Sequence, residues 1–199
     1  MPALALGNPT RVTEYAGRIT DEAERLTRLV SNVFNYTQVD QKQLRIQKAR
    51  ADLGQVVREA LTLVEPIVER AGGSLIVRLE EGLPPASVDQ DAVHQMVRNL
   101  VDNAEKYTRQ SADRRIEVSV SSAGPTTVEI AVRDHGPGVP ATARGRIFAP
   151  FERHDDANQP SGLGLGLSVV RTLALAHGGD VSYEEPTGGG ARFVVRLPV

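Results

Sequence analysis

The sequence predicts an α+β protein: a two-layer sandwich of a mostly antiparallel mixed sheet with helices on one face, preceded by a long N-terminal helix. Segments with the 3.6-residue period of a helix and segments with the two-residue period of a strand follow one another without strict βαβ alternation. A regular heptad pattern occupies residues 12–33 and stands apart from them. The 199 residues suffice for one ordinary domain and one additional element.

The N-terminal helix is predicted from apolar residues that step by four and three positions alternately. They are Val12, Ala16, Ile19, Ala23, Leu26, Val30 and Val33. Further apolar side chains at Tyr15, Leu29 and Phe34 widen the stripe, as is typical of a helix in a four-helix bundle. A surface helix packed on the following domain is the alternative. We assign residues 1–40 to this region and the polar residues 41–51 to a linker that contains a short strand at residues 44–46.

Residues 52–199 are predicted to form the globular domain. Its first helix begins with an N-terminal cap at Asp52 and ends at Gly72-Gly73. A second helix begins near Asp89 or Asp91, and a third covers residues 165–177. The alternating segments predict strands at residues 75–79, 116–120, 128–132, 181–183 and 193–197.

Composition excludes several classes of protein. A formal net charge of −2 offers no general attraction to nucleic acid or to an anionic membrane. The absence of cysteine excludes disulfides and thiolate metal sites. No apolar run approaches the length of a membrane span, so we expect a soluble chain without membrane contact.

A glycine-rich stretch, Gly162-Leu163-Gly164-Leu165-Gly166-Leu167, lies directly before the third predicted helix. Glycines allow backbone N–H groups to approach phosphate oxygens, and the start of a helix favours negative charge. No Lys-Ser/Thr pair follows, so the stretch is not a Walker loop, and no strand precedes it directly as in a Rossmann motif. By itself it fits either a phosphate site or a simple turn.

Three further motifs contain candidate binding residues. Asn99, Asn103 and Lys106 share one face of the second helix, where an amide oxygen can bind Mg²⁺ and a lysine can pair with phosphate. A solvated helix edge is the alternative.

Asp134-His135-Gly136-Pro137-Gly138 follows a strand and places a carboxylate where it could accept a hydrogen bond from an exocyclic amine, although an ordinary turn has the same pattern. Arg146–Arg153 places two phenylalanines around Pro150, which fits a hydrophobic anchor or plain loop packing.

The order and spacing of the four motifs resemble the catalytic and ATP-binding domain of sensor histidine kinases, within the wider Bergerat-fold ATPases. Residues 99–108 resemble the N box, 134–138 the G1 box, 146–153 the F box and 162–167 the G2 box. The resemblance covers about residues 52–199. The helix at residues 12–37 is similar to the second helix of the family's dimerisation and phosphotransfer domain.

The resemblance implies a site for ATP and Mg²⁺, with roles for the residues of each motif. Asn103 would hold Mg²⁺, Asn99 would support the phosphates or the metal's waters, Lys106 would contact phosphate, and Tyr107 the nucleotide. Asp134 would bind the adenine amine, and Gly136 and Gly138 would line the base pocket. Arg153, in a lid formed by residues 139–161, would face the phosphates, as would Gly162, Gly164, Gly166 and Leu167.

The family's phosphoacceptor is a histidine followed by an acidic residue on the first dimerisation helix, and none of the four histidines here matches it. They are His94, His135, His154 and His177. We expect that the chain begins after that helix; a naturally degenerate protein is the alternative. The resemblance then implies a histidine kinase core, cytoplasmic or the cytoplasmic part of a membrane-bound sensor. It would act on the acceptor helix of the same protein, pass the phosphoryl group to a response regulator receiver domain, and form a homodimer at full length.

Two other functions remain to be compared with the kinase. Related ATP hydrolases have a glutamate where this chain has Asn99 and an aspartate where it has Lys106, and an amide cannot take a proton from water. That difference argues against hydrolysis. A non-catalytic ATP-binding regulatory or dimerisation module is the remaining alternative, favoured by the missing acceptor histidine.

Overall fold

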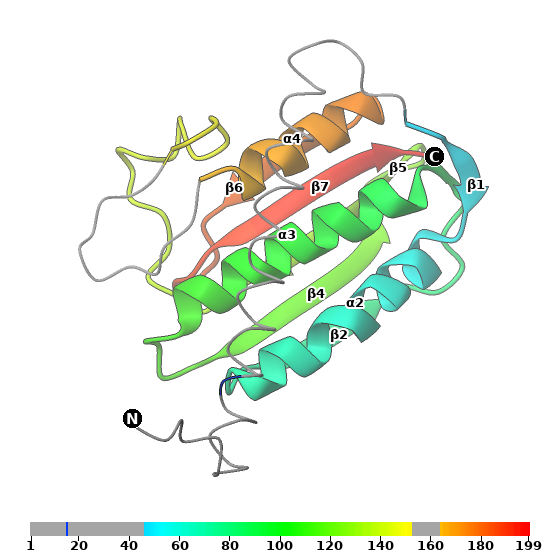
Figure 1. The fold of residues 1–199 in the computed structure, drawn as a ribbon. Coiled ribbons are helices and arrows are strands. Elements are labelled where there is room, and N and C mark those ends of the chain that lie inside the picture. Colours follow the sequence, from blue (N-terminus) through cyan, green and yellow to red (C-terminus); the bar gives the residue numbers. More distant parts are fainter. Residues whose placement is uncertain (1–14, 16–45, 153–163) are drawn as a thin grey trace, which may run out of the picture.

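The computed structural model describes Tyr15, residues 46–152 and residues 164–199 (Figure 1). Apart from Tyr15, which is helical and exposed, the predicted N-terminal helix lies outside the described residues. So do two of the predicted site residues, Arg153 and Gly162.

The main sheet has five strands in the order β2-β4-β5-β7-β6. The strands are β2 (Ser74–Leu79), β4 (Arg115–Ser122), β5 (Thr127–Arg133), β6 (Asp180–Glu184) and β7 (Arg192–Pro198). β2 pairs in parallel with β4, and the other neighbours are antiparallel. The predicted mixed, mostly antiparallel sheet is confirmed.

Three helices cover one face of this sheet, as Figure 1 shows. They are α2 (Leu53–Arg70), α3 (Gln90–Thr108) and α4 (Gly166–Ala176). The side chain of Asp52 accepts a hydrogen bond from the Gln55 backbone N–H at 3.1 Å, and Asp89 caps α3 in the same way through Ala92. The two-layer α+β sandwich is therefore confirmed.

The core lies between the sheet and the helices and consists mainly of aliphatic side chains. Along β4, Ile116, Val118 and Val120 point into it, while Glu117 points to the open face of the sheet. No helix in the described part of the chain is long and apolar enough to span a membrane.

A second, two-stranded sheet was not predicted. β1 (Ala49–Ala51) pairs antiparallel with β3 (Ala86–Val88). Of the strand expected in the linker at residues 44–46, only Ile46 is described, and it is not in a strand; residues 44 and 45 lie outside the described residues. β3 was not predicted because Pro84 and Pro85 precede it directly, and two prolines before a three-residue segment suggest a loop.

The buried His177 joins three elements at one end of the helical layer. Its Nε2 accepts from the Asp89 backbone N–H at 3.0 Å, so its Nδ1–H donates to the Leu173 carbonyl at 2.7 Å. The Lys48 ammonium donates to the His177 carbonyl at 2.9 Å. This junction connects the start of α3, the end of α4 and the segment before β1.

Candidate nucleotide-binding site

The second half of α3 and the start of α4 bring the N box and the glycine stretch together. A Cβ built on Gly166 would lie 4.0 Å from both Cβ and Oδ1 of Asn99. The Nδ2 of Asn99 is buried and has no hydrogen-bond partner among the described residues. A buried amide nitrogen without a hydrogen-bond partner is energetically costly, and this one belongs to a side chain that lies beside the first residue of α4.

No side chain among the described residues caps the N-terminus of α4. Its first helical residue is Gly166, and Leu165 before it makes no side-chain capping hydrogen bond. Uncapped N–H groups at a helix start, next to an unpartnered amide, form a suitable environment for phosphate oxygens. Leu167, also predicted to face phosphate, is half-buried and packs its side chain against the core, which leaves only its backbone for such a role.

Asn103 lies one helical turn beyond Asn99 and is half-buried. No group of three or more histidine, aspartate or glutamate side chains in the described part of the chain could hold a metal ion. A divalent cation here would therefore depend on amide oxygens, water and the phosphates of a nucleotide, which is the ligand set that Mg²⁺ commonly accepts. The two asparagines fit that requirement.

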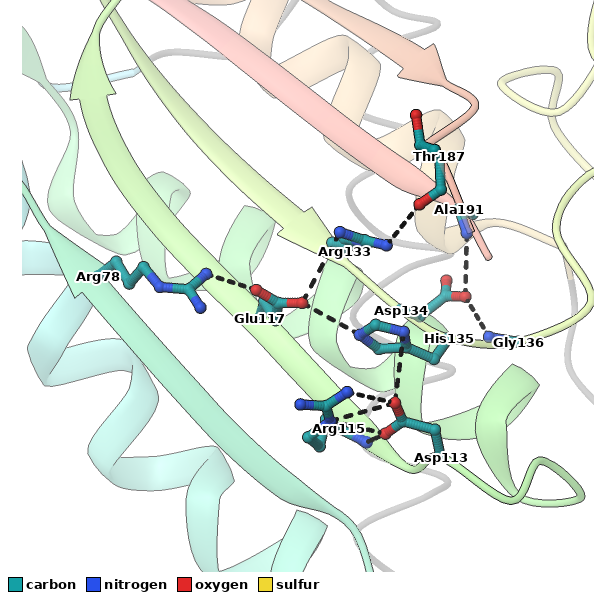
Figure 2. Close-up of polar contacts among 10 residues, drawn as sticks. All are labelled: Arg78, Asp113, Arg115, Glu117, Arg133, Asp134, His135, Gly136, Thr187 and Ala191. Carbon is teal, nitrogen blue, oxygen red and sulfur yellow. Dashed lines mark hydrogen bonds and ion pairs between the residues drawn. The ribbon is translucent and has the colours of Figure 1, made fainter. Parts of the chain in front are cut away.

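Asp134 is almost fully buried, with 2% of its surface exposed, at the end of β5. Its Oδ1 accepts from the backbone N–H of Gly136 at 2.8 Å and of Ala191 at 3.1 Å, as Figure 2 shows. The Asp134 N–H in turn donates to the Ala191 carbonyl at 2.9 Å. No described residue donates to Oδ2, so this oxygen remains available as an acceptor. Burial raises the pKa of the Asp134 carboxyl, although both backbone hydrogen bonds oppose that shift.

The turn after Asp134 is held tightly between two other segments. A Cβ on Gly136 would lie 2.8 Å from the Tyr107 carbonyl oxygen, so this turn contacts the end of the N box. A Cβ on Gly138 would lie 2.9 Å from the Gly190 carbonyl oxygen. These close backbone contacts explain why the positions are glycines.

The segment Gly188-Gly189-Gly190 between β6 and β7 was missed as part of the site. All three residues have positive φ, and a Cβ on Gly190 would lie only 2.0 Å from the Asp134 carbonyl oxygen. Three consecutive glycines before the last strand were the available signal. The sequence alone suggests only a turn there, because it does not show that β7 pairs with β5.

The F box anchors the described part of the predicted lid. The ring of Phe148 packs edge-on against that of Phe193, with centroids 6.2 Å apart, which agrees with the predicted hydrophobic anchor. The Phe151 N–H donates to the Gly164 carbonyl at 3.0 Å, and a Cβ on Gly164 would lie 2.5 Å from the Glu152 carbonyl oxygen. The F box and the glycine stretch therefore meet through their backbones.

The side chains of Lys106 and Tyr107 contact each other. The Lys106 Nζ lies 4.9 Å from the centroid of the Tyr107 ring, both residues being half-buried at the end of α3. Both residues lie at the end of the helix that also carries Asn99, and the Tyr107 carbonyl adjoins Gly136 in the turn after Asp134.

Residues 88–199 match the sequence model of the family described as "Histidine kinase-, DNA gyrase B-, and HSP90-like ATPase". The chain belongs to this family. The match contains all four motifs and the site described above, and it supports ATP binding by this ATPase domain.

Relatives of this ATPase domain are histidine kinases. The chain is 34% identical over 195 residues to histidine protein kinase DivJ of Caulobacter vibrioides, an alignment that covers 95% of the chain and 31% of DivJ. It is 32% identical over 186 residues to sensor histidine kinase TmoS of Ectopseudomonas mendocina, covering 91% of the chain and 18% of TmoS. The chain thus spans less than a third of the length of either protein.

Solved structures show the same ATPase-domain fold. Full-length ShkA, crystallised in complex with AMPPNP, superposes with a TM-score of 0.78 at 27% identity, covering 98% of this chain and 40% of ShkA. The mycobacterial sensor histidine kinase MprB superposes with a TM-score of 0.62 at 28% identity, covering 76% of this chain and 97% of the MprB chain. The predicted resemblance to histidine kinase catalytic domains is confirmed.

Proposed function

We propose that the chain is the ATP-binding catalytic core of a sensor histidine kinase. In this proposal, residues 52–199 bind Mg²⁺-ATP, residues 41–51 are a linker, and residues 1–40 belong to the dimerisation and phosphotransfer region. The γ-phosphorus breaks its bond to the bridging oxygen of ADP and forms a bond to an imidazole nitrogen of a histidine outside this chain. The phosphoryl group then passes to a response regulator receiver domain. The full-length protein acts as a homodimer, with this part in the cytoplasm.

One observation carries the proposal: Asn99 lies beside Gly166, the first residue of α4, and its buried Nδ2 has no hydrogen-bond partner among the described residues. At this position the related hydrolases have a glutamate that activates water. An amide can donate to a phosphate oxygen or bind a metal ligand, but it cannot act as a general base. The site therefore favours transfer to a separate nucleophile over transfer to water.

The remaining residues would orient the nucleotide. Asp134 offers its Oδ2 to the purine amine, the uncapped start of α4 at Gly166 faces the phosphates, and Lys106 contributes positive charge. Asn103, with Asn99, would hold Mg²⁺, which would neutralise phosphate charge during transfer. We include Tyr107, Gly136, Gly138, Gly164 and Leu167 in the nucleotide site, together with Arg153 and Gly162 outside the described residues.

The similarity to named kinases supports a catalytic role over the non-catalytic regulatory module. The two differ in one measurable respect. A kinase core transfers phosphate when an acceptor histidine is supplied, whereas a regulatory module binds ATP and leaves it intact.

The test supplies a separately produced dimerisation hairpin that carries a His-acidic pair, together with γ-labelled ATP. We expect an acid-labile phosphohistidine on the hairpin, which disappears with Asn103→Ala and persists with Gln95→Ala. The Gln95 variant is a matched control, because it removes an amide from the first half of the same helix. Demonstrable ATP binding without phosphohistidine would contradict the kinase assignment. Steady phosphate release that survives Asn99→Ala would instead indicate a hydrolase.

A further inference from the structure

His135 directly follows Asp134, but its side chain contacts a different set of residues. Its Nε2 lies 3.1 Å from Oε1 of Glu117, and its Nδ1 lies 3.5 Å from Oδ2 of Asp113. The side chain is largely buried, with 15% of its surface exposed. Figure 2 shows the imidazole between the two carboxylates, while the Asp134 carboxylate contacts Gly136 and Ala191.

Both carboxylates are held in their charged form by arginines. The hydrogen bond from Arg115 lowers the pKa of Asp113. The hydrogen bond from Arg78, aided by the one from His135, lowers the pKa of Glu117. The imidazole therefore lies between two negatively charged carboxylates, with one ring nitrogen near each of them.

These contacts connect the turn of Asp134 to the segment that follows the N box. Asp113 lies between α3 and β4, and Glu117 is on β4, so His135 attaches the end of β5 to both. On the other side of the turn, Gly136 rests against the Tyr107 carbonyl. The residues directly after Asp134 therefore contact both the end of the N box, at Tyr107, and the residues that follow it, at Asp113 and Glu117.

Glu117 also connects to the opposite wall of the site. The Nη1 of Arg133 lies 3.9 Å from Oε1 of Glu117, and its Nη2 donates to the Thr187 carbonyl at 3.1 Å. Thr187 directly precedes the glycine segment, which is followed by Ala191, whose N–H donates to Asp134. A single carboxylate thus contacts residues that hold both segments around Asp134, as Figure 2 shows.

We propose that His135 is a positioning residue for purine recognition: by bridging Asp113 and Glu117, it holds the turn in which Asp134 presents its free carboxylate oxygen to the exocyclic amine. This inference rests on the proposed function, because it requires the purine to bind at Asp134. His135 does not touch the nucleotide. Its effect appears as discrimination between a purine with the amine and one without it.

The experiment measures dissociation constants for ATP and for purine riboside triphosphate, which lacks the amine, by calorimetry on the whole chain. The unaltered chain is expected to prefer ATP. In His135→Ala, ATP affinity should fall by about fivefold, the value of one hydrogen bond, while affinity for the amine-free nucleotide stays within about twofold. Glu117→Gln removes the negative charge of the acceptor and leaves His135 in place, so it should also reduce the preference for ATP over the amine-free nucleotide. His94→Ala is the matched control, because this histidine lies on α3 near Glu59 and not at the turn.

The outcomes separate the inference from the function on which it rests. Equal losses for both nucleotides, or no loss for either, in a folded His135→Ala or Glu117→Gln variant would overturn the positioning role. If the unaltered chain binds both nucleotides equally, the proposed hydrogen bond between Asp134 and the purine amine is refuted, and the positioning role of His135 is refuted with it. Thermal melting of each variant establishes folding, and Glu117→Gln provides the measurement if His135→Ala does not fold.

Discussion

Replacing Gly190 by alanine should separate backbone strain from contact with the nucleotide site. Gly190 has φ of +86°, and a Cβ there would lie 2.0 Å from the Asp134 carbonyl oxygen. The neighbouring Gly189 has φ of +85°, and a Cβ there meets nothing within 4 Å. The two alanine variants therefore carry the same conformational penalty, and only one of them collides with the turn of Asp134.

The expected magnitudes follow from this geometry. Placing an alanine in the left-handed backbone conformation destabilises the folded state of both variants by roughly 1–2 kcal/mol. In Gly190→Ala the Cβ and the Asp134 carbonyl must separate by about 1.4 Å to reach the 3.4 Å of an ordinary contact. An overpacked contact of this kind costs a further ~1–3 kcal/mol of stability. Displacement of the Asp134 backbone should also move the Asp134 carboxylate out of hydrogen-bond reach of the amine, which lowers ATP affinity about fivefold.

Urea unfolding followed by circular dichroism gives the stability of each variant, and calorimetry gives its ATP affinity. We expect Gly189→Ala to be moderately destabilised with ATP affinity unchanged, and Gly190→Ala to be less stable and to bind ATP more weakly. If both variants show the same unfolding midpoint and the same ATP affinity, the tight contact between the glycine segment and Asp134 is refuted.

Three further predictions concern the site and the core. Burial raises the pKa of Asp134, and protonation of its carboxylate removes the acceptor for the purine amine. The preference for ATP over the amine-free nucleotide should therefore fall as the pH is lowered through that pKa, and a preference that does not change with pH would contradict this. Asn103→Ala should abolish Mg²⁺-dependent nucleotide binding without altering the circular dichroism spectrum, and unchanged affinity by calorimetry would show that the metal is held elsewhere. His177→Ala should destabilise the fold by about 2–4 kcal/mol in urea unfolding, because it leaves a cavity, removes the acceptor of the Asp89 N–H and removes the side-chain donor to the Leu173 carbonyl, which keeps only the backbone N–H of residue 177.

The main elements of the domain followed from local patterns. Alternation at Ile116, Val118 and Val120 identified a strand with one buried face, and the cap at Asp52 located the start of α2 within one residue. β1 and β3 were not predicted, because three-residue strands carry too little periodicity and each forms only by pairing with the other.

For the candidate site, the sequence by itself determined which residues of the N, G1, F and G2 motifs to examine, because each motif is a short stretch whose residue types and spacing carry its chemistry. Only the tertiary structure decided which motifs meet: Asn99 against Gly166, Gly136 against the Tyr107 carbonyl, and Gly190 against Asp134. The pairing of β7 with β5 brings the glycine segment and Ala191 to the turn of Asp134, and the hydrogen bond between Ala191 and Asp134 spans 57 positions of sequence. No local pattern encodes such a contact, because it depends on how the sheet and helices pack as a whole.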